Sequence, residues 1–558
     1  MVTTIVSLAS QPLFVALATI LALCAFIPLV KLIRWRFYIR QLQAQGLPML
    51  PHSLLFGHLP VVTKLLRQLP SDAHPVYMPD QIRHHYPDLG PNYYVDLAPF
   101  APSMLVIGTP EAHYQIAQEH LLKKMPNLKQ FISPLTNGLD ILIMEGAVWK
   151  KWRAVFNPGF SAAHLMTLVP AIVKETETYC KILDEHVEKN EIFAMKHLTD
   201  YLTLDVIGRV VLGTHFDCQR TPNQMVRSLR ILIRWLSFGV EPNLLDRYNP
   251  WRYVMHWYHA GIVDAYISEE LEKRLALQRD GLNNESDVKQ TQTIMDLAIR
   301  AYTEIKAGES SPQDPAAMDP FFRQICMSQI KLFLFSGHDT TSSATCYHLY
   351  LLSKHPAFLA RVQHEHQGVF GSDPTQAASR IAESPHLLNQ LPLTTALIKE
   401  SLRLFPVLSI SRRGEPGFSI IDSQRRAFPT ENFLVFANTH SIHHNPAYWP
   451  DPESFIPERW LVGPDDPLYP VKGAWRGFEH GPRACIGQEL SMLEMKIILV
   501  LVARQYVFKP AYEELDRLAG KDKPTVNGER AYQVNIFQPW GDLPLRVEKG
   551  EGTKLQIA

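Results

Sequence analysis

The sequence has few features that would divide or cross-link it. A length of 558 residues alone would allow three or four domains, but the sequence has no Gly/Ser-rich linker and no internal repeat, so it is compatible with one large domain. Six scattered cysteines without a CxxC pair argue against a disulfide scaffold and a thiolate zinc site. Basic and acidic residues number 55 each, so no excess of positive charge indicates a nucleic acid partner.

Charge is also missing from the start of the chain. No charged residue precedes Lys31, and residues 12–30 are almost entirely apolar, which is long enough to span a bilayer as a helix. Basic residues follow this run, so the bulk of the chain is expected in the cytoplasm. We therefore predict a single transmembrane helix, with residues 1–40 as anchor and basic flank. A cleaved signal peptide is the alternative, but the run is long for one and no basic segment precedes it.

Residues 41–60 are interpreted as a spacer. Pro48 and Pro51 stiffen the chain and cannot continue a helix. The segment therefore reads as a linker that also orients the catalytic body, residues 61–558, against the membrane.

The body reads mostly as helix. Residues 83–302 show amphipathic helical patterns with short breaks, and two polar stretches, 283–291 and 305–318, are predicted loops. Asp319 and Pro320 then provide an N-cap and a first helical residue, and the apolar pattern continues to His355-Pro356. At 1.5 Å per residue this helix would be roughly 50 Å long. It would cross a whole domain, so its interior residues can reach a buried site.

The C-terminal third mixes element types. Residues 408–435 are rich in turn residues and predict a small sheet, and residues 445–475, rich in proline and aromatics, predict an irregular packed loop. Residues 487–503 return to a helical stripe, and 531–547 read as strands. The predicted fold class is mainly α with a small β component.

One cysteine lies in an informative frame. Cys485 leads into a predicted helix, whose N-terminus stabilises a thiolate and lowers its pKa. Gly481 allows a tight turn, and Gly487 lets a flat macrocycle approach the helix. A buried structural cysteine is the commoner fate of a free thiol. The combination with Phe478 and Arg483 favours a thiolate that ligates iron.

This frame resembles the haem-binding loop of the cytochrome P450 family, F-x-x-G-x-R-x-C-x-G, with every fixed position matched. The resemblance implies the cytochrome P450 fold, with Cys485 as the iron ligand of haem b. Arg483 is a candidate to pair with a carboxylate of the haem, and Phe478 to shield the sulfur from water.

A second motif lies in the long predicted helix. Gly337 is expected to make room for a flat ligand, the Thr340 hydroxyl to capture a backbone carbonyl or water, and Asp339 to relay protons. The motif resembles the family's oxygen-activation sequence, with Ser336 where Ala or Gly is usual. A Ser/Thr-rich helix that bonds only to its own backbone is the alternative. Beside Cys485, the catalytic interpretation is favoured.

Glu400 and Arg403 share one face of a predicted helix, a spacing that usually marks a weak surface contact. Their segment resembles the family's E-x-x-R helix, and Arg459 matches its third partner. The resemblance implies a buried structural network that locks the loop around the haem. Trp460 replaces the usual Phe, a change from which we expect little effect.

Trp149 and Arg153, four residues apart, share another helical face. The matching W-x-x-x-R helix of the family uses both against a haem propionate; a basic surface turn with core tryptophans is the alternative. Arg413 is a further propionate candidate, and Arg412 beside it stays open because the spacing after the preceding proline varies in the family.

The resemblance covers nearly the whole chain and is most like fungal secondary-metabolism enzymes. It implies a monooxygenase that inserts one oxygen atom from O2 into a hydrophobic small molecule at the endoplasmic reticulum membrane. NADPH electrons would come through a separate NADPH-cytochrome P450 reductase, because the chain has no flavin or nicotinamide module. Lys150, Lys151 and Arg476 are candidates to dock that reductase, with a solvated basic face as the alternative.

Substrate contacts are expected from residues 131–144, from the long predicted helix near Phe333 and from the tail around Trp540, by position in the family. Two other classes stay open: a haem-thiolate sensor or binding protein without turnover, and a family member that rearranges its substrate without a reductase. The Asp339-Thr340 pair argues against both, since binding needs no proton relay and rearranging members often lose the pair.

Overall fold

The computed structural model describes residues 2–238, 244–283, 292–307, 319–520, 524–535 and 538–550. Helices predominate over four small sheets, as the sequence predicted. The helices are α1 (Val2–Ala44), α2 (Leu59–Leu66), α3 (Met78–His85), α4 (Pro110–Tyr114), α5 (Pro126–Thr136), α6 (Gly146–Phe156), α7 (Ala162–Lys189), α8 (Met195–Leu212), α9 (Gln224–Arg234), α10 (Leu244–Arg247), α11 (Trp251–Asn283), α12 (Ile294–Ala307), α13 (Pro320–Lys354), α14 (Pro356–Phe370), α15 (Ala377–Glu383), α16 (Pro392–Leu404), α17 (Thr439–His443), α18 (Gln488–Val502) and α19 (Tyr512–Ala519).

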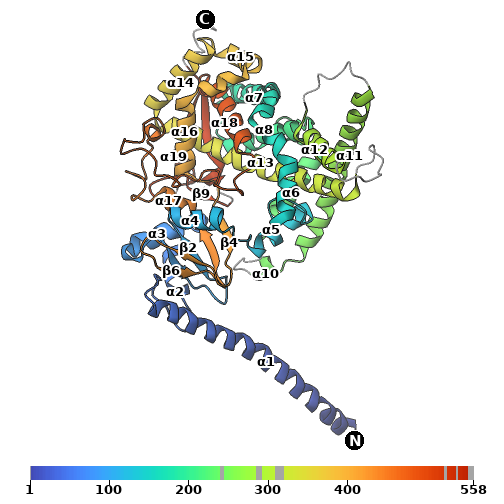
Figure 1. Cartoon of the computed structure of the whole chain (residues 1–558), viewed down its shortest axis with the longest axis vertical. Helices are drawn as coiled ribbons and strands as arrows, with labels where there is room; N and C mark the ends of the chain where they lie inside the picture. The colour runs from blue at the N-terminus through green and yellow to red at the C-terminus, as the bar shows by residue number, and fades with distance from the viewer. Residues whose placement is uncertain are drawn as a thin grey trace.

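The strands are short. They are β1 (Tyr93–Val95), β2 (Met104–Ile107), β3 (Phe193–Ala194), β4 (Ile410–Arg413), β5 (Ser419–Ile421), β6 (Ala427–Pro429), β7 (Leu434–Ala437), β8 (Tyr506–Pro510), β9 (Gln533–Val534), β10 (Gln538–Pro539) and β11 (Pro544–Lys549). The largest sheet has the order β1-β2-β7-β4, with β2 parallel to β7 and the other pairs antiparallel. It joins segments more than 300 residues apart in the chain (Figure 1).

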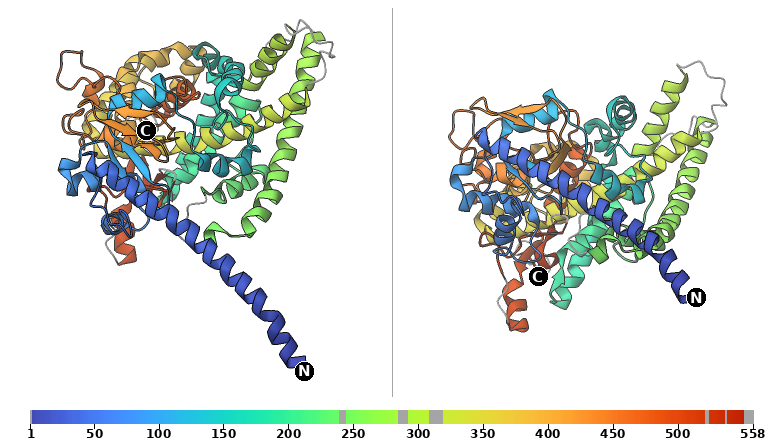
Figure 2. Two further views of the ribbon diagram at one scale, coloured as in Figure 1. Left: turned by 60° about the horizontal axis from the view of Figure 1, so that its bottom comes forward. Right: turned by 90° about the horizontal axis from the view of Figure 1, so that it is seen from below.

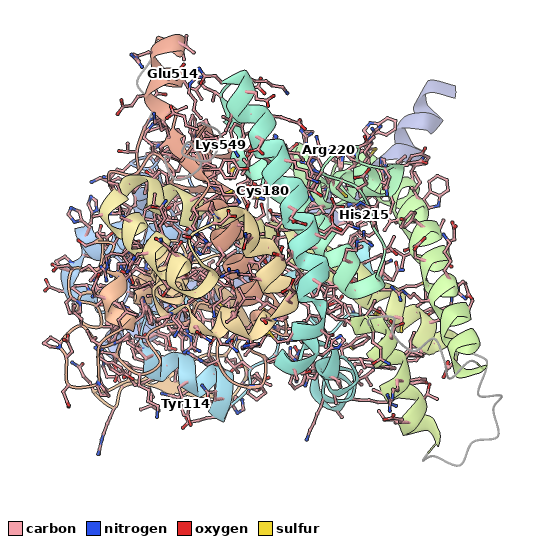
Figure 3. All side chains as sticks on the ribbon, turned by 90° about the horizontal axis from the view of Figure 1, so that it is seen from above. Tyr114, Cys180, His215, Arg220, Glu514 and Lys549 are labelled. Atoms are coloured by element: carbon pink, nitrogen blue, oxygen red, sulfur yellow. The ribbon has the colours of Figure 1, made fainter. Side chains whose placement is uncertain are left out.

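The body has a helical side and a side that holds this sheet. Helix α13 passes through the middle of the body (Figure 1). At one end of the body, Lys549 on β11 pairs with Asp184 on α7, one turn after Cys180 (Figure 3). Helix α1 projects away from the body (Figure 1; Figure 2, left). Among helices whose side chains are described, none alone is long and apolar enough to cross a bilayer. The bent pair Gly146–Phe160 and Ala162–Lys189, with 53° between them, passes that test of length and composition.

The predicted long helix is confirmed. Helix α13 starts at Pro320, where the Asp319 carboxylate accepts a hydrogen bond from the Phe321 N–H, and it ends just before His355-Pro356. The sheet near residues 408–435, the irregular segment 445–475, the helix after Gly487 and the C-terminal strands are also confirmed.

One prediction of secondary structure is wrong, and another lies mostly outside the described residues. Residues 93–107 were included in the helical region, but they form β1 and β2, because their apolar side chains are buried in the largest sheet. The two predicted loops lie, except for their first residues, outside the described residues.

Candidate active site around Cys485

The loop before α18 holds Cys485 by its backbone. The Cys485 N–H donates to the Phe478 carbonyl over 3.0 Å, and the Ala484 N–H donates to the Gly481 carbonyl over 3.0 Å. Gly481 adopts a φ of 82°, and a β-carbon there would lie 2.6 Å from the Ala117 carbonyl oxygen. The turn therefore requires glycine, as predicted.

The predicted direction of the Cys485 pKa is wrong. Burial raises the pKa of this thiol, and the Gly487 N–H and the Arg153 guanidinium offset that rise only in part. The helix contributes little because α18 begins three residues later, at Gln488. Solvent nevertheless reaches the Cys485 side chain. A bound cation beside the sulfur would favour the thiolate form of Cys485.

The other cysteines of the body have the burial typical of unreactive thiols. Cys218, Cys326 and Cys346 are buried, and Cys180 is partly covered where α7 meets β11 (Figure 3). Burial raises the pKa of Cys180 and of Cys346 to about 12. Among the described cysteines of the body, Cys485 is thus the one residue that is exposed.

Helix α13 reaches the same region. The Thr341 hydroxyl lies 3.1 Å from that of Ser491 on α18, so the two helices cross next to the Cys485 loop. The Thr340 hydroxyl donates to the Ser336 carbonyl over 2.7 Å, the backbone capture expected for it. Ser336 is exposed, although the helix is buried on both sides of it.

The contact of Gly337 differs from the predicted one, which was to make room for a flat ligand. A β-carbon at Gly337 would lie 2.9 Å from the Ile207 Cδ1 on α8. This glycine therefore allows two helices to pack closely and does not by this contact make room for a ligand. The accessible residue at this turn is Ser336.

Asp339 has a partner that the sequence did not indicate. Lys196 on α8 is buried, and its Nζ lies 2.6 Å from the Asp339 carboxylate and close to that of Asp200. Burial alone would lower the pKa of Lys196, but the two carboxylates raise it above its usual value. Lys196 is therefore a fixed cation between the carboxylates of Asp339 and Asp200.

A group of cations gathers beside the Cys485 loop. Its members are Lys124, Arg153, Arg412 and Arg483, and desolvation lowers the pKa of each of them, that of Arg483 to about 10. Glu145 pairs with Arg483 at 2.7 Å. The single negative charge of Glu145 does not neutralise the four cations. The group therefore carries excess positive charge and fits a ligand that has carboxylates.

The two neighbouring arginines on β4 differ in burial. Arg412 is 2% exposed, and its Nε has no hydrogen-bond partner among the described residues, whereas Arg413 is exposed. Arg413 is held by its backbone, whose N–H donates to the Lys123 carbonyl. Strand alternation turns Arg412 inward and Arg413 outward, so the geometry favours Arg412, the open alternative, over Arg413.

Trp149 and Arg153 both lie against the Cys485 loop. The Arg483 guanidinium lies 4.1 Å from the Trp149 ring centroid, a cation–π contact. Arg153 donates to the Ala484 carbonyl over 3.1 Å. The predicted helical face is thus present, and both side chains contact the residues around the sulfur.

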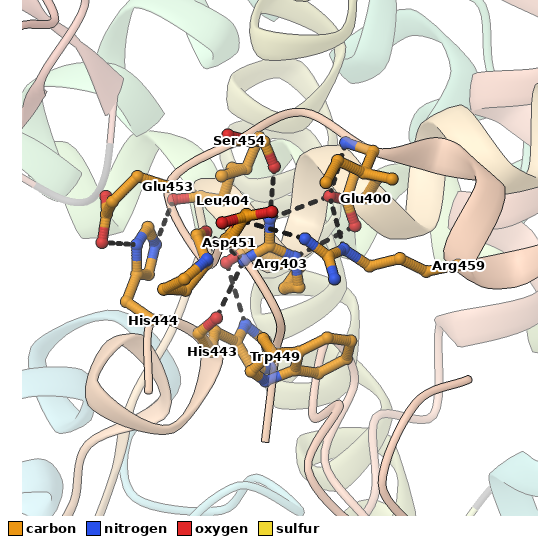
Figure 4. Close-up of polar contacts among 12 residues, drawn as sticks. Glu400, Arg403, Leu404, His443, His444, Trp449, Asp451, Glu453, Ser454 and Arg459 are labelled. Carbon is orange, nitrogen blue, oxygen red and sulfur yellow. Dashed lines mark hydrogen bonds and ion pairs between the residues drawn. The ribbon is translucent and has the colours of Figure 1, made fainter. Parts of the chain in front are cut away.

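The predicted Glu400 network is confirmed and fully buried (Figure 4). Arg403 donates to both carboxylate oxygens of Glu400, over 3.0 and 2.8 Å, and to the carbonyls of His443, Pro452 and Ser454. Arg459 lies 3.4 Å from the same carboxylate. The network joins α16 to the irregular segment before the Cys485 loop.

Next to this network, Trp460 makes a contact that the sequence did not indicate, and the expectation for Arg476 is wrong. The Trp460 Nε1 donates to Glu400 over 3.1 Å, so this residue adds a hydrogen bond that phenylalanine lacks. Arg476 is 3% exposed and pairs with Glu479, so it cannot form part of a docking surface. Lys150 and Lys151 are exposed.

The regions expected to contact the substrate lie in different surroundings. Phe131 stacks on Phe238 at 4.1 Å, in the predicted segment. Phe333 is buried and packs on Phe156 and Phe160, so it belongs to the core. Trp540 donates from its indole N–H to Asp72, over 2.7 Å.

Comparison with known proteins agrees with this geometry. The family model for cytochrome P450 matches residues 55–535. The chain belongs to the cytochrome P450 family. A P450 monooxygenase of Polytolypa hystricis, polC, is 41% identical over 93% of this chain and 92% of its own, and acrF of Aspergillus aculeatus is 33% identical over 86% and 98%. The solved haem domain of cytochrome P450DA shares the fold, with a TM-score of 0.67 at 17% identity over 91% of this chain and 98% of its own.

The P450 family implies a haem-thiolate iron, and the residues present fit it. An added β-carbon at Gly487 would meet only the Cys485 Sγ within 4 Å, at 3.9 Å, so the backbone leaves space beside the sulfur. The buried Arg412 Nε and the excess positive charge fit two haem carboxylates. As a P450 monooxygenase, the chain is an oxidoreductase.

Replacing Arg412 by glutamine is expected to weaken haem retention about 10- to 100-fold, because a buried charge-assisted hydrogen bond contributes about 1.5–3 kcal/mol. The rate of haem transfer to apomyoglobin measures this. Arg413→Gln, one residue away and exposed, is the matched control and should transfer haem at the wild-type rate. Faster loss from the Arg413 variant alone would reverse the assignment.

Proposed function

We propose that this P450 inserts one oxygen atom from O2 into a hydrophobic small molecule, as a tailoring step in fungal secondary metabolism. The single observation that carries the proposal is the exposed Cys485 in the loop before α18, the helix that contacts α13 through Ser491 and Thr341. The monooxygenase names of the two fungal relatives support the reaction class. Electrons from NADPH would arrive through a separate NADPH-cytochrome P450 reductase, whose acidic face Lys150 and Lys151 are placed to meet.

We propose that Cys485 ligates the haem iron and that Arg412, Arg483 and Lys124 hold the haem carboxylates. Bound haem supplies dioxygen activation, to which a thiolate ligand contributes electron density. Trp149 and Arg153 support this arrangement through their contacts with Arg483 and Ala484. Gly481, Gly487 and Phe478 shape the loop.

Proton supply is assigned to Asp339 and Thr340. The Thr340 hydroxyl donates its hydrogen bond to the Ser336 carbonyl, so the hydroxyl oxygen can accept a hydrogen bond on the accessible side. Asp339 is linked through Lys196 to Asp200, and this chain of charged groups is the proposed proton route. The buried Lys196 keeps the Asp339 carboxylate fixed next to Thr340.

The test is NADPH oxidation by the full chain with reductase and an apolar metabolite selected by its type-I spectral shift. The expected result is a product that contains one oxygen atom from labelled O2. Thr340→Ala is expected to keep haem but to divert most reducing equivalents to peroxide, because proton delivery is impaired. NADPH oxidation without any oxygenated product, or full coupling in the Thr340 variant, would contradict the proposal.

We also propose that residues 1–40 anchor the chain, single-pass, in the endoplasmic reticulum membrane with the body in the cytoplasm. Exposed apolar side chains of α1, among them Ile20 and Phe26, support this, and so do those of α10 and α11, where Tyr253 and Trp257 are each 78% exposed. Helix α10 lies on the side of the body from which α1 projects (Figure 1). The full-length protein should stay with microsomes after an alkaline carbonate wash; complete release would refute the anchor.

A further inference from the structure

Gln329 on α13 holds a neighbouring segment, residues 139–145, by its backbone. The Gln329 side-chain oxygen accepts a hydrogen bond from the Ile141 N–H over 3.0 Å, and the side-chain nitrogen donates to the Leu139 carbonyl over 2.7 Å. Gln329 itself is fully buried. Because one amide group satisfies both a donor and an acceptor of the segment, Gln329 fixes the place of segment 139–145 relative to α13.

The Cys485 loop holds the same segment. Arg483 donates to the Ile141 carbonyl over 3.3 Å and to the Met144 carbonyl over 2.6 Å. Ile141 is thus bonded through its N–H to α13 and through its carbonyl to the loop that contains Cys485. Segment 139–145 therefore connects the part of the chain that carries the proposed iron ligand with the helix that carries the oxygen-activation motif.

The side chains of this segment fall into two groups. Asp140 is buried and turns back on the segment, because its carboxylate accepts hydrogen bonds from the Leu142 and Ile143 N–H groups. The side chains of Leu142, Ile143 and Met144 stay partly exposed, although each packs against the core. Three consecutive apolar side chains that are only half covered, on a backbone that is firmly bonded, are suited to contact an apolar ligand.

We propose that Gln329 is a positioning residue for the reaction: by holding segment 139–145, it sets where the partly exposed apolar side chains of this segment contact a ligand bound over the iron. The inference rests on the proposed function and deepens it, because it names a residue that decides which ligands fit. Under that function such a ligand lies between the Cys485 loop and α13, so a segment bonded to both reaches it. Without the amide, the Ile141 N–H and the Leu139 carbonyl would lose this partner and the segment would shift.

The experiment compares Gln329→Leu, which removes both hydrogen bonds, with Gln329→Glu in the haem-loaded full chain. A protonated carboxyl has one donor and one acceptor, as the amide has, whereas a carboxylate can only accept. Burial raises the pKa of a carboxyl, so Gln329→Glu should keep both hydrogen bonds at about pH 6 and lose one of them by about pH 9. Burial also raises the pKa of Asp140, which is present in every variant, so each value is compared with wild type at the same pH.

Two readouts need no turnover. The first is hydrogen exchange of the peptide that covers segment 139–145, measured by mass spectrometry. The second is spectral titration with two probes that bind iron: imidazole, which is small enough to contact little else, and clotrimazole, whose aromatic rings extend well beyond the iron. Ser343→Ala is the matched control, since the Ser343 hydroxyl is buried in the same helix without a partner among the described residues.

Gln329→Leu is expected to speed exchange in this peptide severalfold and to weaken clotrimazole binding about 10-fold, with imidazole binding unchanged. Gln329→Glu should bind clotrimazole as wild type does at about pH 6 and as weakly as Gln329→Leu at about pH 9. Ser343→Ala should match wild type throughout.

Unchanged clotrimazole binding in Gln329→Leu, or equal weakening of both probes, would overturn the proposal, and so would a Gln329→Glu variant that does not recover at low pH. If Gln329→Leu does not accumulate as folded protein, the pH series of Gln329→Glu decides alone. The probes bind without turnover, so such a failure in a chain that still oxygenates refutes only the role of Gln329, whereas absence of oxygenation refutes the proposed function.

Discussion

Cys485→Ala is expected to abolish the red-shifted Soret band of the reduced carbonyl complex, because the sulfur of this residue is the proposed iron ligand. The loop around it should survive, since the two hydrogen bonds that shape it, Cys485 N–H to Phe478 and Ala484 N–H to Gly481, come from the backbone. The circular dichroism of the variant should therefore match that of wild type. The measurement is the carbonyl difference spectrum per mole of folded protein.

Cys180→Ala is the control for this variant. Cys180 also lacks a disulfide, but it lies where α7 meets β11, and burial raises its pKa to about 12 (Figure 3). Its replacement should leave the band at full height. A band that persists in the Cys485 variant would show that another residue ligates the iron.

Glu400→Gln is expected to prevent accumulation of folded, haem-loaded protein. Two buried guanidinium groups, those of Arg403 and Arg459, would lose their shared carboxylate, and removing one partner of a buried ion pair costs about 3–5 kcal/mol (Figure 4). That loss is a large part of the stability of a typical domain. The measurement is the yield of soluble haem protein together with the thermal unfolding midpoint.

An exposed ion pair of the same region serves as the control for the Glu400 variant. Arg361 and Glu458 pair at the surface, with side chains 48% and 40% exposed, and such pairs contribute at most about 1 kcal/mol. Arg361→Ala should therefore express and bind haem as wild type does. If Glu400→Gln behaved in the same way, the network would not be the lock that its burial indicates.

Local patterns predicted those parts of the structure that depend on neighbours in the chain. The start of α13 at Asp319-Pro320 and the turn at Gly481 follow from the backbone preferences of those residues. The Glu400–Arg403 pair follows from helical spacing, and its burial from the family resemblance. The mainly helical fold was predicted on the same basis.

Contacts between distant elements were not predictable in this way. Lys196 reaches Asp339 from another helix, and nothing in the sequence around either residue indicates that partner. The assignment between Arg412 and Arg413 depends on which face of β4 turns inward, and a shift of one residue reverses it. Strands β1 and β2 were missed because they are short and buried, without the alternation of an exposed strand.

The sign of the Cys485 pKa shift shows why local rules also fail at the site itself. The N-terminus of α18 provides a favourable partial positive charge, but the thiol lies three residues before this helix and is desolvated by the rest of the fold. Burial outweighs the weakened dipole, so the pKa rises. A metal cation is the contribution strong enough to reverse this shift.

The most direct test of thiolate ligation is the spectrum of the wild-type chain, purified with an ample haem supply, reduced and exposed to carbon monoxide. The account predicts the red-shifted Soret band of a haem whose axial ligand is a cysteine thiolate. A carbonyl spectrum typical of imidazole ligation, or a protein that purifies without haem, would contradict it.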